Sequence, residues 1–429
     1  MKSWFKISKI AITGSTVLSL NLNKDLINLC DQSGGTMKIG YFTTRFPYKN
    51  PLTGEVIFHS HDGGVENVAY SLAVEMAKRG HEIFIFTSSI NSTNSIEDYG
   101  KIKIYRYKKN FIIGQAPISL DLLYKPLISD LCLDIVHAHM GNLPAPLTAL
   151  FFSMIKNKPF IITHHGDWIG GYGGLKRRIG VFLFNNYLCD FILTRTNSII
   201  GLSESHVADS RSLQKYFSKI EVIPNGVNLD DFDIPLSKEE CRNLLNLPKD
   251  KSIILFVGSL TPRKAPDVLL KAMEKIVQES PDSYLVLVGE GSWKNNLKEM
   301  AKTLGIDNDV LFTGFIDDDM KILHYKAADV FVLPSLSEAF PLTLMEAAAS
   351  GLPLVGSGLE CFKEIIDVDC NGFLTKTGDY NDLAKKIIYL LNDKELRLKM
   401  GANSLNKVKE FSWEKVAQDT EQVYLTLTM

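Results

Sequence analysis

Short apolar runs separated by helical segments recur along this chain, and their order restricts how it can fold. An apolar run at 38–47 is followed by a glycine pair, by a segment at 66–80 whose apolar residues fall at helical spacing, and by another apolar run at 81–89. A strand, a helix and a second strand in this order form a βαβ unit, whose two strands are parallel. The start of the pattern therefore predicts an α/β fold.

The pattern continues and then begins again. Further strands that run into loops are predicted at 134–141, 160–168, 198–206 and 220–226. A second series of strands, separated by helical stretches such as 265–280, is predicted at 252–260, 282–291, 309–315, 329–338 and 352–358. Buried parallel strands read as continuous apolar runs, as these do. We therefore expect two doubly wound, Rossmann-like parallel-sheet domains.

The break between the two series falls at Pro224-Asn225-Gly226, which a polar, acidic segment follows. Turn residues at this point indicate a domain junction, so we place the domains at 37–226 and 227–409. Residues 410–429 have apolar side chains near one helical face, which predicts a terminal helix that docks on the fold. Ligands of such sheets bind beyond the carboxyl ends of the strands, so two facing domains would enclose a central cleft.

Composition narrows the classes of function. The chain has 429 residues, 45% of them hydrophobic, a formal net charge of -2 and a pI of about 6.5. Residues 37–225 carry 20 basic and 15 acidic groups, whereas residues 226–429 carry 23 and 32. Without a dense basic stripe, nucleic acid is a poor candidate partner. The basic first half is compatible with an anionic surface or acceptor, and equally with a chance imbalance of solvated side chains.

The cysteines and the hydropathy of the chain indicate in which cellular compartment the protein is found. None of the six cysteines forms a C-x-x-C pair, which is typical of a reduced cytoplasmic protein rather than a disulfide scaffold or a zinc site. No segment reaches the roughly 18 apolar residues of a membrane span. Residues 1–36 hold a weakly hydrophobic stretch that resembles a secretion signal without a convincing cleavage site. We expect these residues to be an extension outside the fold, and the protein to be cytoplasmic, at most peripheral at the inner membrane face.

The run PSLSEAFPLTLMEAAASGLP, residues 334–353, contains the most informative chemistry. Pro341 fits the first turn of a helix and Gly351 fits its end, so Glu338 lies in the preceding loop and Glu346 within the helix. Free N–H groups at a helix N-terminus bind phosphate, and a buried carboxylate needs a partner. Phosphate donors flanked by two carboxylates that accept hydroxyl hydrogen bonds fit a sugar nucleotide.

With these residues in view, the chain resembles glycosyltransferase family 4, whose members are retaining enzymes with the GT-B fold. The resemblance rests on the form E-x-F-[GP]-x-x-x-x-E-A in this run and covers residues 37 to about 427. Other motifs in the family's order are MKIGYFTTRFP, GGVENVAYSLAVEMAKRG, VHAHMG, THHG at 163–166, IPNGV, FVGSLTPRK, LVGEG and FTGF. It implies transfer of a hexose-type sugar from a UDP- or GDP-sugar to a glycan, a lipid-linked molecule or a small polyol, with no metal or other cofactor. It also implies that the terminal helix crosses back to the first domain.

The resemblance assigns catalytic and phosphate-binding roles to four residues. Glu338 and His165 match the catalytic residues near the transferred sugar, and Arg263 and Lys264 match the cations that bind the donor diphosphate. Preorganised cations stabilise the charge of a departing diphosphate and can replace a metal in that role. By analogy with the family, we expect retention by front-side displacement, in which the leaving phosphate accepts the proton of the acceptor.

The remaining implied donor-binding residues come from both halves of the chain. They are Gly63, Gly64, Phe315, Ile316, Phe340, Pro341, Leu342, Thr343 and Glu346. Glu346 matches the residue that holds the ribose hydroxyls, Phe315 and Ile316 match the edge that receives the base, and 340–343 match the backbone donors. The glycine pair matches a turn where the backbone approaches the substrates.

The chain departs from the family in two places, and one of its loops is unusually long. Ser259 stands where arginine is frequent, which removes one expected cation, and Arg263 is the residue that compensates. Ala265 stands where glycine is usual. The loop 46–62 is longer than we expect, which suggests that it shapes the acceptor site.

Four features allow other interpretations. His137, His139, His164 and His165 suggest a zinc cluster, although no partner carboxylate or cysteine has clear ligand spacing. Asp317-Asp318-Asp319 resembles a divalent cation site, but acidic residues also suit the start of a helix. Gly289-x-Gly291 suggests a dinucleotide fingerprint that lacks its third glycine. Lys176-Arg177-Arg178 begins either a basic membrane-surface helix or a core helix with a solvated start.

Two other functions remain open on the sequence. The chain could be a catalytically silent member that binds a sugar nucleotide or a partner, or a two-domain sugar-nucleotide epimerase. Donor hydrolysis or transfer would separate an enzyme from a silent binder, and product analysis without an acceptor would reveal an epimerase.

Overall fold

The computed structural model describes residues 35–58, 63–113, 116–168 and 175–429. Lys38–Met429 forms one compact unit. Residues 1–34 of the expected N-terminal extension lie outside the described residues. Every described strand and helix belongs to Lys38–Met429.

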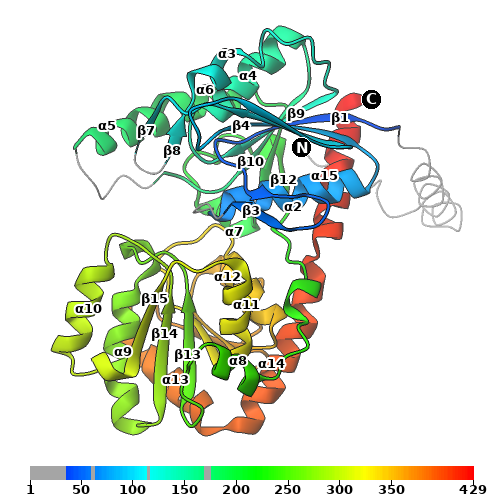
Figure 1. Ribbon diagram of the computed structural model, residues 1–429. Helices are drawn as coiled ribbons and strands as arrows, with labels where there is room; N and C mark the ends of the chain where they lie inside the picture. The colour runs from blue at the N-terminus through cyan, green and yellow to red at the C-terminus, as the bar shows by residue number, and fades with distance from the viewer. Residues whose placement is uncertain (1–34, 59–62, 114–115, 169–174) are drawn as a thin grey trace, which may run out of the picture. The chain divides into compact units, whose positions relative to one another are not determined.

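Within the described residues, the first sheet has eight strands in the order β12-β11-β10-β9-β1-β4-β6-β5 (Figure 1). The strands are β1 (Lys38–Phe42), β4 (Glu82–Ser88), β5 (Ser95–Tyr99), β6 (Ile102–Tyr107), β9 (Ile135–Met140), β10 (Phe160–His164), β11 (Ser198–Gly201) and β12 (Ile220–Val222). Neighbours are parallel except β5, which runs antiparallel to β6. Strands β9 and β10 are buried along their whole length, including the histidines that they carry.

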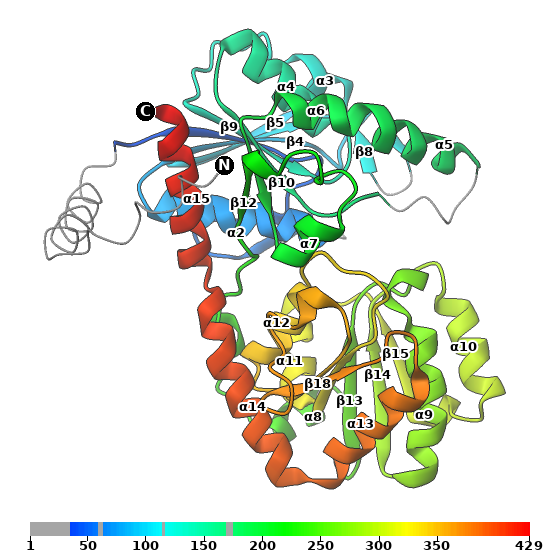
Figure 2. The same cartoon turned by 180° about the vertical axis from the view of Figure 1, so that it is seen from behind.

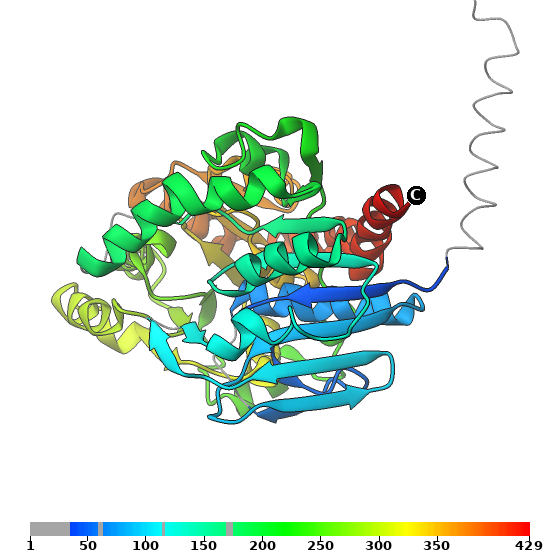
Figure 3. The same ribbon diagram turned by 90° about the horizontal axis from the view of Figure 1, so that it is seen from above.

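Helices cover both faces of this sheet. Helix α2 (Gly64–Lys78) lies on one face, and α3 (Leu120–Tyr124), α4 (Ala145–Lys156) and α6 (Cys189–Arg195) lie on the other (Figure 3). Helix α5 (Leu175–Leu183) and the π-helix η1 (Phe184–Leu188) precede α6, and the short α7 (Glu204–Asp209) follows β11. None of the described helices has the length and apolar run that a membrane span requires.

In the described part of the chain, the second sheet has six strands in the order β15-β14-β13-β16-β17-β18, all parallel. They are β13 (Ser252–Val257), β14 (Ser283–Val288), β15 (Val310–Gly314), β16 (Val330–Leu333), β17 (Leu354–Ser357) and β18 (Gly372–Thr375). Helices α9 (Pro266–Glu279), α10 (Lys294–Thr303) and α13 (Tyr380–Asn392) lie on one side, and α8 (Lys238–Leu244), α11 (Asp318–Ala327) and α12 (Leu342–Ala349) on the other (Figure 2). The prediction of two parallel α/β sheets is therefore confirmed.

Several short strands had no clear sequence signal. They are the hairpin of β2 (Tyr48–Lys49) and β3 (Val56–Phe58), the β5–β6 pair, the hairpin of β7 (Phe111–Ile113) and β8 (Ala116–Ile118), and β18. Strand β6 alternates buried and partly exposed residues near the sheet edge instead of forming an apolar run. These strands were not predicted because they are short or lie near a sheet edge, and not because of their composition.

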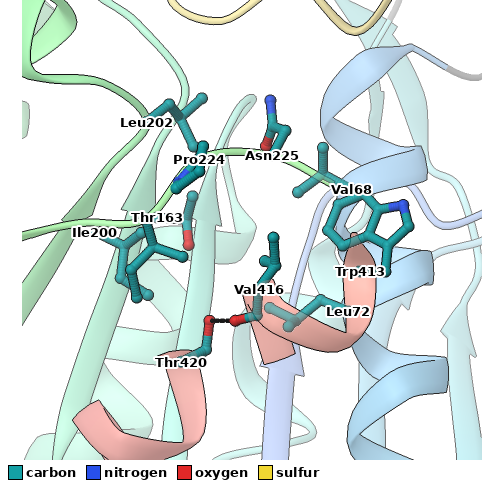
Figure 4. Close-up of a pocket in the computed structure, with 11 residues that line it drawn as sticks. Val68, Leu72, Thr163, Ile200, Leu202, Pro224, Asn225, Trp413, Val416 and Thr420 are labelled. Carbon is teal, nitrogen blue, oxygen red and sulfur yellow. Dashed lines mark hydrogen bonds between the residues drawn. The ribbon is translucent and has the colours of Figure 1, made fainter. Parts of the chain in front are cut away.

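The chain connects the two sheets twice, and the two connections lie side by side. The N–H of Val227 donates to the carbonyl oxygen of Phe411 at 2.8 Å. A Cβ added at Gly226 would lie 2.7 Å from Cδ2 of Trp413, so only glycine fits beside this ring. A small pocket of about 10 Å³ beside them is lined mainly by apolar side chains, among them Val68 and Val416 (Figure 4).

The C-terminal segment belongs to both halves of the fold. Helix α14 (Lys394–Val408) packs near β17 and α12, whereas α15 (Trp413–Thr428) packs along α2 (Figures 1 and 2). Ser412 caps α15 by accepting a hydrogen bond from the N–H of Lys415. The fully buried hydroxyl of Tyr424 lies 2.9 Å from the Tyr41 hydroxyl and 2.6 Å from Nδ1 of His137. The last helix is thus fixed by polar contacts inside the first sheet's core.

Histidines are buried near the carboxyl ends of β9, β10 and β11. His137, His139 and His164 lie on β9 and β10, and His206 lies on α7. Burial lowers the pKa of His137 and His164 to about 3 and that of His206 to about 4. These imidazoles are therefore neutral in the folded protein at neutral pH.

Replacing Tyr424 with Phe should destabilise the fold. The substitution leaves the buried Tyr41 hydroxyl and the His137 ring without their shared partner, which costs about 1–3 kcal/mol. Urea denaturation should show a lower midpoint at unchanged slope. Tyr389→Phe, at an exposed ring, is the matched control. Equal midpoints for both variants would contradict the structural role of the Tyr424 hydroxyl.

Stability should fall in mild acid because of the buried histidines. Their folded pKa values lie below the unfolded value of 6.5, so below about pH 6.5 only the unfolded chain binds the protons. Between pH 7.5 and pH 5.5, His137, His164 and His206 together should reduce the free energy of unfolding by about 4 kcal/mol. Urea titrations at the two pH values measure this loss. In His206→Gln the loss should shrink by about 1 kcal/mol; an unchanged loss would show that His206 does not contribute.

Candidate active site

A buried carboxylate joins the loops that follow β13 and β16, which are adjacent strands of the second sheet. Nζ of Lys264 lies 2.5 Å from Oε1 of Glu338, and Nη1 of Arg263 lies 2.7 Å from Oε2. The Ser335 hydroxyl donates to Oε1 at 2.7 Å. Arg263 also donates to the carbonyl oxygen of Ser337 at 2.9 Å. The structure therefore brings together three residues that the sequence assigned to catalysis and diphosphate binding.

The opposite charges in this cluster offset the energetic cost of burying its charged groups. Burial raises the pKa of Glu338, but the charges of Lys264 and Arg263 outweigh that effect and hold the pKa below its usual value. For Lys264, burial lowers the pKa and the Glu338 carboxylate opposes the change. Because two cations face one carboxylate, the group keeps a net positive charge. This charge is available to an anionic ligand.

The backbone beside Lys264 is strained. Residues Pro262–Lys264 form the 3₁₀ turn η4, and Ala265 follows with φ 47° and ψ 47° before α9 begins. This left-handed conformation costs an L-residue with a Cβ about 1–2 kcal/mol and favours glycine. The conformation explains why glycine is usual at this position in the family that the sequence resembles.

Helix α12 directly follows the loop that carries Glu338. Pro341 is the N-cap, one residue outside the helix, and the helix begins at Leu342. Within the described residues, no backbone carbonyl accepts a hydrogen bond from the N–H of Phe340, Leu342 or Thr343, as is usual at a helix start. Pro341 has no N–H, so it cannot be one of the backbone donors predicted at 340–343. The Phe340 ring is buried against Phe411, which leaves only its backbone for a ligand.

The second predicted carboxylate, Glu346, is held by two side chains of α11. Lys321 Nζ lies 2.9 Å from its Oε1 and the Tyr325 hydroxyl donates to Oε2 at 2.7 Å. Burial lowers the pKa of Lys321, but Glu346 and Asp318 outweigh that effect and raise it above its usual value. Since a carboxylate has about four acceptor positions, Glu346 can still accept two hydroxyl groups.

A strand of the first half of the chain reaches the same helix. Lys49 of β2 forms an ion pair with Asp318, which also contacts Lys321 at 3.1 Å. Burial raises the pKa of Asp318, but Lys321 and Lys49 outweigh it and hold the pKa at about 2. Asp317 caps α11 by accepting from the N–H of Met320 at 2.8 Å, which confirms the capping interpretation of the acidic run.

The residues predicted at the base differ in exposure. Phe315 follows β15 and is 42% exposed, whereas Ile316 packs against the core of the second sheet. An exposed aromatic side chain beside a partly buried aliphatic one can stack on a planar base. This part of the prediction rests on their place after β15.

His165 follows β10, and its ring lies in a stack of imidazoles. Its Nε2 lies 3.1 Å from Nδ1 of His139, with ring centroids 5.3 Å apart. Burial, followed by the neighbouring histidines, lowers its pKa well below the usual value. His165 is therefore a neutral imidazole near pH 7.

Loops of the first half lie against the loop of Glu338 and the start of α12. A Cβ added at Gly64 would lie 3.3 Å from Cδ1 of Leu342, and one added at Gly166 would lie 3.6 Å from Cβ of Ala339. The Ser203 hydroxyl donates to the carbonyl oxygen of Ala339 at 3.4 Å. Gly63 is the N-cap of α2, and its N–H donates to Glu66. The neighbours of His165 and Glu338 are thus in contact.

Other interpretations of the sequence can now be compared with the geometry. A Cβ at Gly289 would lie 2.0 Å from the carbonyl oxygen of Gly258, and one at Gly291 would lie 2.2 Å from that of Leu260. The two glycines therefore allow the loops after β13 and β14 to approach closely, which accounts for them without a dinucleotide. Among the described residues, no group of three or more His, Cys, Asp or Glu side chains is arranged to hold a metal ion.

Three contributing residues were absent from the sequence-based prediction. Lys321 and Tyr325 bind Glu346 from another helix, and Tyr424 reaches the histidines from the end of the chain. No spacing rule connects these positions, because only the packing of separate helices brings them together.

Comparisons with known proteins agree with this geometry. The family described as Glycosyltransferase Family 4 matches residues 62–231, and the family described as Glycosyl transferases group 1 matches residues 237–407. Together they span most of the two sheets.

Individual relatives cover most of the chain. A UDP-Gal:alpha-D-GlcNAc-diphosphoundecaprenol alpha-1,3-galactosyltransferase of Escherichia coli is 31% identical over 72% of this chain and 80% of its own length. A phosphatidyl-myo-inositol mannosyltransferase of Mycolicibacterium smegmatis is 27% identical over 87% and 94%. The structure of sucrose-phosphate synthase from Thermosynechococcus elongatus matches with a TM-score of 0.72 at 22% identity, covering 91% of this chain and 98% of that chain. This chain is a glycosyltransferase that belongs to glycosyltransferase family 4 and has the GT-B fold.

Proposed function

We propose that this glycosyltransferase transfers a hexose-type sugar from a nucleoside diphosphate sugar, with retention of anomeric configuration and without a metal ion. The observation that carries the proposal is the buried Glu338 carboxylate between Lys264 and Arg263. This cluster keeps a net positive charge. The next helix begins with the N–H groups of Leu342 and Thr343, for which the described residues supply no backbone acceptor. Fixed cations and helix N-terminal donors stabilise a leaving diphosphate.

The same half of the chain supplies contacts for the nucleoside. Glu346 has acceptor capacity left for the ribose hydroxyls, and Phe315 is exposed for stacking on a base. We favour a uridine donor over a guanosine donor because the name of the E. coli relative specifies UDP-Gal. The two donors differ in their base and not in the diphosphate, so the cation cluster serves both.

Front-side displacement suits the electrostatics of Glu338. A carboxylate that contacts two cations is a weak nucleophile, so a covalent glycosyl intermediate on Glu338 is disfavoured. In the proposed step, the bond between the anomeric carbon and the phosphate oxygen breaks. The bond to the acceptor oxygen forms on the same face, and the acceptor's hydroxyl proton passes to the leaving phosphate oxygen. Glu338 and His165 then orient the sugar and stabilise positive character at its ring.

A membrane-borne acceptor is the second part of the proposal. The large apolar side chains at 175, 179, 182, 183 and 187 are exposed and recur at helical spacing along α5 and η1. The sequence of α5 also contains Lys176, Arg177 and Arg178. Apolar and basic residues on one helix suit an anionic lipid surface. Both relatives named above act, by their names, on lipid-linked substrates.

Lys264→Ala and Glu338→Gln should each lower transfer by at least about a hundredfold. The first removes a cation that stabilises the leaving diphosphate, and the second removes the carboxylate that stabilises positive character at the sugar ring. Released nucleoside diphosphate is measured after incubation with a panel of UDP- and GDP-sugars and candidate acceptors. Lys302→Ala and Glu299→Gln are matched controls, since these residues form an exposed ion pair in the same half of the chain. Near-normal turnover in Lys264→Ala or Glu338→Gln would overturn the assigned role.

The donor panel also separates the other functions. A nucleotide sugar at 100 times its Kd raises the stability by about 2.7 kcal/mol, so thermal shifts identify binding without turnover. Binding with neither hydrolysis nor transfer by the wild type would indicate a silent member. Conversion of the donor sugar without an acceptor would indicate an epimerase.

The exposed side of α5 should bind anionic vesicles. Wild-type protein should sediment with vesicles of phosphatidylglycerol and phosphatidylcholine, but not with phosphatidylcholine alone. The double variant Ile179→Glu/Phe182→Glu should remain in the supernatant, because each buried apolar side chain contributes about 1.5–3 kcal/mol. Leu398→Glu, at an exposed position on α14, is the control. Equal sedimentation of all three proteins would refute this surface.

A further inference from the structure

Three imidazoles form a continuous stack at the carboxyl end of the first sheet. His137 and His139 are alternate residues of β9, so they share one face of the sheet. Their ring centroids are 4.9 Å apart with an interplanar angle of 16°, and His139 stacks on His165 with 5.3 Å and 23°. His137 and His139 are buried, whereas His165 is partly exposed.

The first ring of the stack has both nitrogens occupied. Nδ1 of His137 lies 2.6 Å from the Tyr424 hydroxyl, and Nε2 lies 2.8 Å from the Thr163 hydroxyl. Hydroxyl groups can donate or accept, so either tautomer of His137 satisfies these contacts. These contacts fix the position of the His137 ring, on which His139 stacks, but they do not decide which nitrogen of His137 carries the proton.

The contact between His139 and His165 does have a defined direction. Nδ1 of His139 lies 3.1 Å from Nε2 of His165, and one of these two nitrogens has to donate. Within the described residues, Nε2 of His139 is buried and has no hydrogen-bond partner. A neutral imidazole has one N–H and one lone pair, so the two choices leave different groups without a partner.

The two choices differ in cost. If His165 donated from Nε2, the proton of His139 would be on its Nε2 as a buried N–H without an acceptor. If His139 donates from Nδ1, only a lone pair is left unpaired. Orphaned N–H groups are rarer in proteins than acceptors that lack a donor. The second arrangement is therefore favoured, and it places the proton of His165 on Nδ1.

We propose that His139 is a positioning residue: its Nδ1–H donates to Nε2 of His165, so that His165 presents an Nδ1–H donor, and no free lone pair, to the donor sugar. This inference rests on the proposed sugar-facing role of His165. Burial lowers the pKa of both imidazoles well below the usual value, which keeps each in a single neutral form at pH 7. In the described part of the chain no hydrogen bond reaches Nδ1 of His165.

The proposal has a consequence for the mechanism. An imidazole whose lone pair is occupied by His139 cannot accept a proton from the acceptor, so His165 binds a sugar oxygen and is not a general base. The proton of the acceptor then has to leave by another route, which agrees with its transfer to the leaving phosphate. The neighbouring Gly166 lies beside Ala339, so the donor N–H belongs to the loop that meets the Glu338 segment.

Nuclear magnetic resonance tests the tautomer directly. Long-range ¹H–¹⁵N spectra of ¹⁵N-histidine-labelled protein at pH 7 distinguish protonated from bare ring nitrogens, and His165→Asn identifies the His165 signals among the nine histidines. The expected result is a protonated Nδ1 and a bare Nε2 on His165. A protonated Nε2, or a doubly protonated ring, would overturn the proposal. This measurement needs no donor and no turnover.

Substitutions of His139 test its effect on catalysis. Asparagine places an amide N–H near the position of Nδ1, whereas leucine fills similar space without a donor. His139→Leu should lower kcat/KM for the donor by about tenfold or more, and His139→Asn by much less, as expected for one hydrogen bond. Thermal unfolding confirms that both variants fold. Equal loss in both variants with an unchanged His165 tautomer would mean that His139 is only structural.

The outcomes separate this proposal from the proposed function. If wild-type protein shows no turnover with any nucleotide sugar, the proposed function fails while the tautomer measurement still decides the role of His139. If turnover is normal and His165 carries its proton on Nε2, the proposed function stands and the inference fails.

Discussion

A carboxylate that is buried away from water needs a partner of opposite charge. In the second sheet, the buried carboxylate of Glu338 has two such partners. Glu338 is paired with Lys264 and Arg263, so the loops after β13 and β16 are held to each other by charge as well as by strand pairing. The removal of one partner from a buried ion pair is costly because it leaves an unpaired charge. The same pairing keeps both cations in place before any ligand arrives. Preorganised charge of this kind needs little rearrangement when a diphosphate develops negative charge.

The polar side chains at the carboxyl ends of β9 and β10 differ from this cluster, because the histidines there are buried without charge. The imidazoles of β9 and β10 stay neutral because burial penalises their protonated forms. The hydrogen-bond partners of His137 are Thr163 and Tyr424, a residue near the end of the chain. Helix α15 therefore completes the polar core of the first sheet. The candidate site thus combines the fixed charges of Lys264, Arg263 and Glu338 with the neutral imidazoles of β9 and β10.

Much of the fold was readable from the sequence, because buried parallel strands leave apolar runs and their carboxyl ends share one edge. That rule also explains why Arg263 and Glu338, 75 residues apart, meet. Other contacts have no local signature. Lys321 and Tyr325 reach Glu346 only because α11 and α12 lie on the same side of the sheet, and Tyr424 contacts a residue 287 positions earlier. The edge strand β5 and its neighbour β6 also escaped prediction, because β5 is mostly exposed and β6 alternates buried with partly exposed residues instead of forming an apolar run.

The alanine that replaces the usual glycine beside Lys264 has an effect on the unfolded chain as well as on the folded one. Ala265 adopts φ 47° in the folded protein, and a residue with a Cβ samples fewer backbone conformations than glycine does in the unfolded state. Ordering this turn therefore costs less entropy, which offsets part of the steric penalty. The lysine is consequently attached to a stiffer segment than a glycine would provide, and its position should vary less from one moment to the next.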